Sequence, residues 1–542
     1  MIEGGKDIRV REAREEDVGH IRDLFHIVYG PDYPHRKFLD ETWLKRSIFN
    51  DDILLLVAED IESGELLGSA SVLFDTGTHS DLVGEFGRLV VHPDARHLNV
   101  GKALMAKRVE FIQNRLHVGI VENRTVHPFS QRISLSHKFA AVGFLPLKNK
   151  FHERESMALF SRHFGQALSL RRNNPRIIPE AHGLAHFALK NCSLPNDAII
   201  DDDSPAYPQS HDYSLEELTD TSLPPLIRIE RGRVRRREIF GPVGLQYGFF
   251  QLRVRRANYL LARERGVEGA AGPIAGAIGY ILDPEDKNLR VFELIAQTDE
   301  VIGFLFKSLL DRCRKKWDIE YLEVDTSAYS PRMQRTLLEL GFLPAAYIPA
   351  MVFHEVERLD VIRMIHLRVP FELGQIHLTP PAQIIADQVI RTFTCHKILP
   401  QVAQAMARLS LFQGLTEEQE ARLAGICCVQ RFESGETLFH QGTPADRMLI
   451  VLEGSVRVHL SEASEPVGTI QAGESVGELS FLTGEHHSAT ARTDGPVLAA
   501  VFLDDDLAAL IRQRPDIGMI LFRNLGVGLG RKLQRMDRDK VS

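Results

Sequence analysis

Residues 85–103 read EFGRLVVHPDARHLNVGKA, and this stretch decides the fold of the N-terminal part of the chain. It begins as an apolar strand, passes through a loop that contains proline, aspartate and arginine, and continues into a long helix. Apolar residues recur in that helix at the spacing of one buried face: Met105, Val109, Ile112 and Leu116. A strand, a loop and a helix in this order indicate an α/β unit.

The same alternation of strand and helix patterns extends over residues 8–160. IRVREA (8–13) is typical of a strand, and EEDVGHIRDLFHIVYG (15–30) is typical of a helix. Two apolar runs on either side of Glu-Ser-Gly-Glu (62–65) predict a hairpin. After residues 85–103 and the long helix, a further strand, a helix and a turn at Gly143–Phe144 complete the unit.

The composition narrows the class of protein. A chain of 542 residues is too long for one hydrophobic core, so we expect several domains. The net charge of −8 disfavours attraction to nucleic acid and to anionic membranes, and no run of about 18 apolar residues exists. The N-terminus lacks the apolar core of a signal peptide. We therefore expect a cytoplasmic protein without a DNA or membrane partner.

The five cysteines and the scattered histidines predict neither disulfides nor a metal site. Their number is odd and their spacing matches no ligand motif. His182, His186 and Cys192 lie close in the sequence, but a solvated helix face explains them better than metal binding does. We expect no bound metal.

A second unit repeats features of the first. GAIGYILDPEDKNLRVFELIA (276–296) is typical of a hairpin, and a helix and a strand follow it. The tetrapeptide Gly-Phe-Leu-Pro occurs at 143–146 and again at 341–344. From about residue 400, short strands with glycine turns indicate a β-roll with flanking helices. The predicted fold is a multidomain α/β and α+β protein with two mixed-sheet units before the roll. The predicted domains are 1–165, a linker at 166–227, 228–372 and 373–542.

The element order and the loop at 96–103 resemble the GNAT N-acetyltransferase superfamily over about residues 8–160. This family binds the coenzyme A pyrophosphate with backbone N–H groups at a glycine-bearing helix start. Asn99 stands where the family has its first glycine, and asparagine tolerates left-handed backbone angles. The resemblance implies acetyl-CoA as substrate and these cofactor-binding residues: Leu89, Val91, Arg96, Asn99, Val100, Gly101, Lys102 and Ala103.

Acetyl transfer to a lysine needs a proton acceptor, because an amine with a pKa of about 10.4 is almost entirely protonated at pH 7. Glu85 sits where protein-acetylating branches of the family place a glutamate base, although an ordinary carboxylate at a strand end explains it equally well. Phe139 replaces the tyrosine with which the family often protonates the leaving thiolate. His127 and Ser130 follow a strand and are candidates for the acceptor side, or simply polar surface residues.

The second unit departs from the family at the equivalent loop, ELIAQTDEVIGF (293–304). It lacks the arginine and the glycines, and it carries Asp299 and Glu300 at the helix start. Carboxylates there cap a helix well and repel a pyrophosphate. We therefore predict that this unit has a structural or acceptor-binding role. The basic run at 228–238 is expected to pair within the chain rather than with nucleic acid.

VGELSFLTGEHHSATAR (476–492), with the glycine-bearing strands before it, resembles the phosphate-binding cassette of the cyclic nucleotide-binding family; the resemblance covers residues 408–535. In that family a glutamate binds the ribose and an arginine binds the phosphate; His487 replaces that arginine. The resemblance implies a possible cAMP effector and these contacts: Gly477, Glu478, Leu479, Ser480, His487 and Ser488. We expect weak cAMP binding that strengthens as the imidazole is protonated below pH ~6.5, or else a silent roll used for dimerisation or docking.

Together these features predict an acetyl-CoA-dependent N-acetyltransferase that acts on protein lysine and is regulated by a cyclic nucleotide. Members of the two families that are fused in the opposite order acetylate protein lysines. Two alternatives stay open: acetylation of a small amine, and a non-catalytic scaffold that binds acyl-CoA and nucleotide. The acceptor and the oligomeric state do not follow from the sequence.

Overall fold

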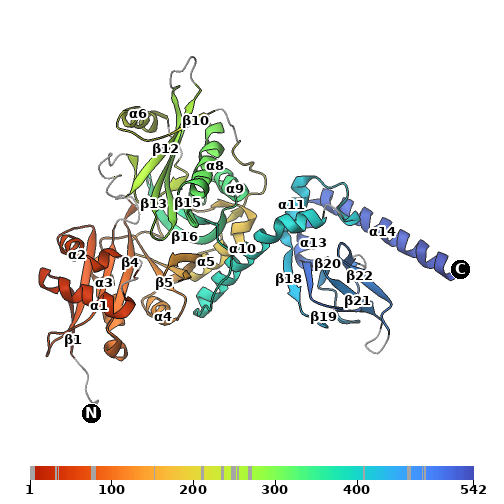
Figure 1. Cartoon of the computed structure of the whole chain (residues 1–542), viewed down its shortest axis with the longest axis horizontal. Helices are drawn as coiled ribbons and strands as arrows, with labels where there is room; N and C mark the ends of the chain where they lie inside the picture. Colours follow the sequence, from red (N-terminus) through yellow and green to blue (C-terminus); the bar gives the residue numbers. More distant parts are fainter. Residues whose placement is uncertain are drawn as a thin grey trace, which may run out of the picture. The chain divides into compact units, whose positions relative to one another are not determined.

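The computed structural model comprises two compact units, Met1–Val389 and Ile390–Ser542 (Figure 1). Residues 373–389, which the sequence pattern groups with the roll, belong to the first unit. No helix in the described part of the chain is long and apolar enough to cross a membrane. The structure describes residues 7–30, 33, 36–74, 81–151, 153–208, 213–233, 237–245, 252, 256–265, 272–406, 409–460, 465–478, 480 and 484–541.

The first half of unit 1 is a mixed sheet with helices on both faces. Leu55 and Val57 of β2 pack in the core formed with α1 and α2, whereas Gly68 of β3 lies under Val100 and Leu104 of α3. Because Gly68 pairs with Ala58, on the β2 face opposite Leu55 and Val57, α3 covers the other face of the sheet. The elements are β1 (Ile8–Glu12), α1 (Val18–Tyr29), α2 (Glu41–Ile48), β2 (Ile53–Asp60), β3 (Leu66–Leu73), β4 (Val83–Val91), α3 (Val100–Ile112), β5 (Val118–Arg124), α4 (Phe129–Ser136), β6 (Ala140–Lys150) and β7 (Arg154–His163).

The second half of unit 1 repeats most of this order and adds β8, α5, β9 and β11. Helix α8 covers one face of its sheet at Gly276, and α6 packs on the other face. The described part of the predicted linker includes α5, whose Leu184 and Ala185 are buried. The elements are β8 (Arg176–Ile177), α5 (Pro179–Asn191), β9 (Ile199–Ile200), β10 (Tyr213–Glu217), α6 (Leu223–Arg233), β11 (Ile239–Phe240), β12 (Ala257–Glu264), β13 (Ile274–Asp283), β14 (Asn288–Ala296), α8 (Glu300–Lys315), β15 (Tyr321–Ser327), α9 (Pro331–Glu339), β16 (Leu343–His354) and β17 (Glu357–Leu367).

The two halves share one continuous sheet whose order reads the same from both edges. The order is β1-β2-β3-β4-β5-β7-β6-β16-β17-β15-β14-β13-β12-β10, and β11 pairs with β15 beside this path. In each half, a parallel pair (β4 with β5, β14 with β15) lies next to antiparallel strands. Strands β6 and β16 meet at the centre, so the two halves are related by an approximate two-fold axis.

The repeated Gly-Phe-Leu-Pro segments explain this central join. Gly143 pairs with Ala346, and a side chain at position 143 would collide with the Ala346 Cβ. Glycine therefore lets the two central strands approach closely. The sequence pattern assigns Gly143–Phe144 to a turn, and this is wrong, because both residues lie within β6 next to an irregularity in its pairing with β7.

The C-terminal unit is a roll of two four-stranded antiparallel sheets, in the orders β18-β25-β20-β23 and β19-β24-β21-β22. Helix α10 (Pro380–Met406) begins in unit 1 and continues into this unit. The mixed-sheet units followed by a β-roll are the predicted fold class. The elements after α10 are α11 (Glu417–Ile426), β18 (Cys428–Phe432), β19 (Thr437–Phe439), β20 (Arg447–Glu453), β21 (Ser455–His459), β22 (Gly468–Gln471), β23 (Ser475–Val476), β24 (Thr490–Thr493), β25 (Val497–Leu503), α13 (Asp504–Gln513) and α14 (Pro515–Val541).

Candidate active site

A cavity of about 850 Å³ opens where β4 and β5 separate. The two strands pair only from Val83 to Glu85 in the described structure, and their later residues line the cavity. Arg88 bends β4 here with a left-handed φ of 54°. Beyond Glu85, the edge of β4 that faces β5 therefore presents backbone N–H and C=O groups to a ligand.

The start of α3 forms part of the cavity wall. Asn99 precedes the helix with φ 59° and ψ 19°, the left-handed conformation expected for an asparagine in this loop. Its carbonyl accepts hydrogen bonds from the N–H groups of Lys102 and Ala103 at 3.0 and 3.1 Å. Its side chain makes no capping hydrogen bond in the described structure. The N–H groups before these two donors, those of Val100 and Gly101, stand at the positive end of α3, where helix starts bind anions.

Most of the predicted cofactor-binding residues meet at this cavity. Val100 is instead fully buried against β3, and neither it nor Ala103 belongs to the lining that the structure describes. This follows from helix geometry, because Val100 points to the sheet while Gly101 faces the cavity. The predicted residues in the lining are Leu89, Val91, Arg96, Asn99, Gly101 and Lys102.

Gly101 has little room for a side chain. A Cβ at this position would lie 3.0 Å from Ile133 Cδ1, 3.7 Å from Leu89 Cδ2 and 3.8 Å from Val91 Cγ2. Any larger side chain would extend into the cavity beside the start of α3. Gly101 thus keeps open the space that a pyrophosphate requires.

Glu85 lines the cavity and forms an ion pair with Arg88. The carboxylate that the sequence proposes as the base is thus bound to a guanidinium. Arg108 also lines the cavity and is buried, and it donates hydrogen bonds to the carbonyls of Ser71 and Gly87 at 3.1 and 3.2 Å. Burial lowers the Arg108 pKa to about 9.

The other sequence candidates divide between the cavity and the core. His127 and Ser130 both line the cavity, and burial lowers the pKa of His127. Phe139 is 2% exposed and packs edge-on against Phe86, with 5.0 Å between the ring centroids. Phe139 is therefore a core residue behind β4.

Sequence reasoning missed two groups of lining residues. Tyr29 and Tyr33 come from the end of α1 and the segment after it, and their rings stack with centroids 4.6 Å apart. Burial raises the pKa of both. Aromatic residues on either side of Gly30 were a signal that could have identified them. The second group comes from the second half of unit 1 and carried no local signal: Asp283, Asp286, Asn288, Arg290 and Arg363.

The equivalent opening in the second half is filled by the chain itself. Strands β14 and β15 pair from Asn288 to Val291 on β14, and β15 then pairs with β11 instead. Ile239 and Phe240 of β11 are 1% and 2% exposed. A Cβ on the next residue, Gly241, would lie only 2.5 Å from the Phe292 Cα. The strand β11 thus fills the space that the first half leaves open as a cavity.

The loop of the second half also differs from its prediction. Asp299 is at the N-cap of α8, but its carboxylate makes no capping hydrogen bond in the described structure and pairs with Arg332 at 2.8 Å. Two carboxylates still stand at this helix start, as expected. The basic run at 228–238 lies partly outside the described residues; within it, Arg237 stacks over Phe240.

The cassette of the roll keeps part of the predicted geometry. Gly477 has φ 90°, and a Cβ there would lie 3.0 Å from the Arg447 carbonyl oxygen, so glycine is required. Glu478 is half-buried, Ser480 is buried and Ser488 is exposed. The predicted contact Leu479 lies outside the described residues.

The side chain of His487 is buried, whereas a side chain that took the place of the phosphate-binding arginine would be exposed to solvent. His487 is 2% exposed and stacks on Phe439, with 3.9 Å between centroids and 10° between ring planes. Its Nδ1 lies 3.4 Å from the Ser480 hydroxyl, and its buried Nε2 makes no hydrogen bond in the described structure. Burial lowers its pKa, while Asp446 acts in the opposite direction. The expectation that His487 gains a proton near pH 6.5 is therefore wrong.

Two family descriptions match the chain. Residues 18–133 match the acetyltransferase (GNAT) family, and residues 429–514 match the cyclic nucleotide-binding domain. The first range contains the open cavity and the start of α3, and the second contains the cassette of the roll.

Curated relatives match only in part. The CRP-like cAMP-activated global transcriptional regulator of Mycobacterium tuberculosis (H37Rv) is 30% identical over 139 residues, which are 25% of this chain and 60% of that protein. Glutaminase 1 of Bradyrhizobium diazoefficiens is 28% identical over 257 residues, 47% of this chain and 41% of that protein. The chain thus spans less than two thirds of these relatives. Among solved structures, the N-terminal domain of a Streptomyces coelicolor A3(2) transcriptional regulator is 29% identical, with 24% of this chain and 94% of that chain covered and a TM-score of 0.22.

Proposed function

Because the chain carries a GNAT-family acetyltransferase domain and a C-terminal cyclic nucleotide-binding domain, we propose that it is an acetyl-CoA-dependent N-acetyltransferase controlled by a cyclic nucleotide. The observation that carries this proposal is the cavity between β4 and β5, with the start of α3 in its wall. The acceptor that we favour is the amine of a protein lysine. A small amine is the alternative acceptor.

Acetyl-CoA is bound both by positively charged side chains and by backbone groups of this chain. The first N–H groups of α3 bind the pyrophosphate, and Arg96 and Lys102 add positive charge beside them. The free backbone edge of β4 at Leu89 and Val91 pairs with amides of the pantetheine arm. This arrangement directs the thioester toward the point where β4 and β5 separate.

Transfer then requires that the acceptor amine lose a proton. Its nitrogen attacks the thioester carbon, the C–S bond breaks, and the thiolate leaves as the thiol after taking a proton. Two carboxylates of the cavity are candidates for accepting the amine proton: Glu85, which the sequence favours, and Asp286, which the second half contributes. A base is needed at pH 7 because the free lysine amine is nearly all cationic.

Regulation has a structural route within the first unit. The buried side chain of Gln131, on α4, donates to the His377 carbonyl at 3.0 Å and accepts from the Thr379 N–H at 3.0 Å. Ser130 and Ile133 of the same helix line the cavity. Because Thr379 directly precedes α10, a movement of α10 would displace α4 and so change this wall of the cavity. We propose this path for the effect of cyclic nucleotide on turnover.

The test is calorimetry of the full chain with acetyl-CoA, cAMP and cGMP, followed by mass spectrometry of a lysine peptide incubated with acetyl-CoA. We expect one acetyl-CoA per chain, acetylated lysine, and a rate that changes with cyclic nucleotide. Binding of acetyl-CoA without transfer to the peptide or to small amines would favour a scaffold. Absence of acetyl-CoA binding would overturn the proposal.

A further inference from the structure

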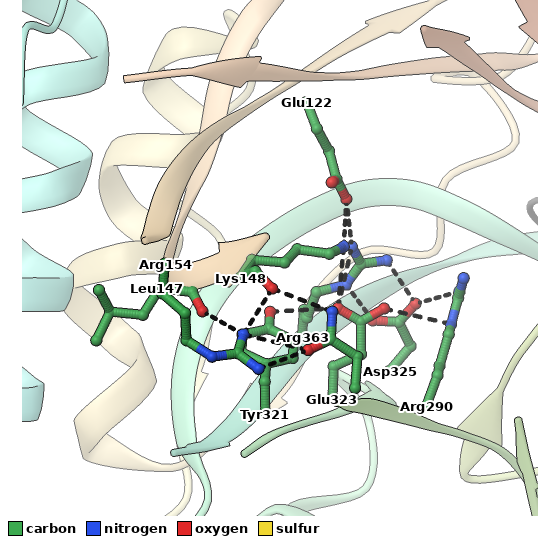
Figure 2. Close-up of polar contacts among 10 residues, drawn as sticks. Glu122, Leu147, Lys148, Arg154, Arg290, Tyr321, Glu323, Asp325 and Arg363 are labelled. Carbon is green, nitrogen blue, oxygen red and sulfur yellow. Dashed lines mark hydrogen bonds and ion pairs between the residues drawn. The ribbon is translucent and has the colours of Figure 1, made fainter. Parts of the chain in front are cut away.

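The cavity of the first half has a wall that the second half builds. Five lining residues come from β13, β14, the turn between them and β17. The cations among them and the neighbouring Lys148 already have carboxylate partners (Figure 2). Arg363 pairs with Asp325 at 2.7 Å, Arg290 with Asp325 at 3.0 Å, and Lys148 with Glu122 at 2.6 Å. The positive charge of this wall is therefore neutralised within the protein.

Asp286 differs from these paired groups. It is 7% exposed and lines the cavity, yet no donor lies within hydrogen-bonding distance of its carboxylate in the described structure. Its backbone is fixed: its N–H donates to Asp283 Oδ1 at 3.2 Å, and its carbonyl accepts from Arg154 Nη2 at 2.7 Å. Its oxygens are not among the buried, unpartnered polar atoms of the described residues, so the carboxylate is open to the cavity, where a ligand can supply the donor that the protein does not.

The surroundings of Asp286 suit a group that exchanges a proton. Burial raises its pKa to about 6, and the neighbouring carboxylates Asp283 and Glu285 act in the same direction. The cations Arg154 and Lys148 act in the opposite direction. The carboxylate is thus mostly ionised at pH 7 but holds a proton more readily than an ordinary aspartate, as a general base should.

We infer that the second half supplies the acceptor site, in which Asp286 binds the ammonium of a lysine-like primary amine and accepts its proton. This rests on the proposed acetyl transfer. The ammonium fills the empty donor position at the Asp286 carboxylate, and Asp283, at the exposed end of the same turn, adds negative charge for a cation. One amine proton passes to Asp286 and then to solvent; a second leaves the nitrogen as the new C–N bond forms and the thiolate is protonated.

Asp286 suits this role better than Glu85. Glu85 already has a cation, Arg88, as its ion-pair partner. Its role is then to hold Arg88 in the bent part of β4. The second half repeats the strand order of the first half with β11 in its opening, and the inference gives that half a function in substrate selection.

The first experiment measures the pH dependence of kcat/KM with acetyl-CoA and a lysine peptide whose α-amine is blocked. We expect the wild-type rate to fall below about pH 6, because Asp286 is then protonated. Asp286→Asn should lower kcat/KM by about 10²-fold at pH 7, and its rate should no longer fall in this way below about pH 6. Asp286→Glu should restore part of both. The matched control is Glu285→Gln, in the same turn but outside the described lining. It should keep the fall in rate at acidic pH, shifted to slightly lower pH because Glu285 helps to raise the Asp286 pKa.

The second experiment does not need turnover. Calorimetry in the presence of coenzyme A compares the lysine peptide with the same peptide carrying norleucine. Wild type should bind the lysine peptide about tenfold more tightly, and Asp286→Asn should lose this difference. Thermal unfolding confirms that the variants fold. An unchanged fall in rate at acidic pH together with an unchanged preference in Asp286→Asn overturns the inference, and so does loss of that fall in Glu85→Gln alone. Absence of transfer by wild type, with the lysine preference intact, refutes the proposed function but not the acceptor site.

Discussion

Gly101 shows how one missing side chain makes a binding site. A Cβ there would already lie 3.0 Å from Ile133 Cδ1, and any larger side chain would enter the cavity beside it. The sequence already indicated a glycine-bearing helix start. The structure adds the reason why the residue before it, Val100, does not line the cavity: its side chain is turned toward β3.

We predict that Gly101→Glu abolishes acetyl-CoA binding, because it places both bulk and negative charge where the pyrophosphate binds. Calorimetry should show a loss of more than ~10²-fold in affinity. Asp299→Asn, at the equivalent helix start of the second half, is the matched control and should bind like wild type. Stoichiometric binding by Gly101→Glu would contradict the assignment of the site.

His487 illustrates how burial changes the chemistry expected of a residue type. Its lowered pKa means that the unfolded roll binds a proton more tightly than the folded roll does. The free energy of unfolding should therefore fall as the pH drops below about 6.5, the ordinary pKa of histidine. Above that pH the imidazole is neutral and contributes no charge to a phosphate.

We predict that wild type binds cAMP weakly and equally at pH 7.5 and 6.5. His487→Arg should bind it about ten- to a hundredfold more tightly, because a guanidinium pairs with the phosphate. Titration calorimetry at the two pH values measures this. Tighter wild-type binding at pH 6.5 would show that the ligand draws the imidazole out of its stack on Phe439. If neither protein binds at either pH, regulation by cAMP should be abandoned.

At the scale of elements, β11 distinguishes the two halves of unit 1. Both halves have a parallel strand pair that separates, but among the residues that the structure describes only the second half has a strand inserted at that point. We expect this insertion to exclude acyl-CoA more directly than the carboxylates at Asp299 and Glu300, because β11 occupies the space itself.

We predict that Phe240→Ala lowers the free energy of unfolding by about 3–5 kcal/mol, since it removes a buried ring of β11, the strand that pairs with β15. The first half should still bind one acetyl-CoA. Thermal unfolding and calorimetry measure the two effects, with Phe49→Ala as control because Phe49 is 75% exposed. A second acetyl-CoA bound by Phe240→Ala would show that the second half retains a competent site.

At the scale of the whole molecule, buried charges hold the two halves together. Glu122 and Lys148 come from the first half and Glu323, Asp325 and Arg363 from the second (Figure 2). Arg363 is 1% exposed, and its pKa is raised because the nearby carboxylates outweigh burial. Such a network fixes one arrangement of the halves, since any other leaves a buried charge unpaired.

We predict that Arg363→Met destabilises the protein by about 3–5 kcal/mol, because it leaves buried carboxylates uncompensated. Thermal unfolding should show a large fall in the stability of the variant. Added salt should not cause a similar fall in wild type, because the network is buried. Lys287→Met is the control, because Lys287 forms its ion pairs at the surface and should have little effect. Equal losses in the two variants would contradict the proposed role of the buried network.

The sequence by itself determined the parts of this protein that depend on neighbouring residues. The order of strands and helices, the left-handed Asn99 before α3 and the glycine at Gly477 follow from local periodicity and backbone preference. So does the division into mixed-sheet halves and a roll. The Gly143–Phe144 turn was predicted wrongly. In the sequence, a glycine that is required for close contact between strands cannot be distinguished from a glycine in a turn.

Only the tertiary structure decided which residues share a site. The Asp286 carbonyl accepts a hydrogen bond from Arg154, which is 132 residues away in the sequence. The filling of the second cleft by β11 and the burial of His487 under Phe439 likewise depend on distant segments. Local sequence patterns do not predict such contacts, because the burial and the charge pairing of a residue depend on its surroundings in the folded protein.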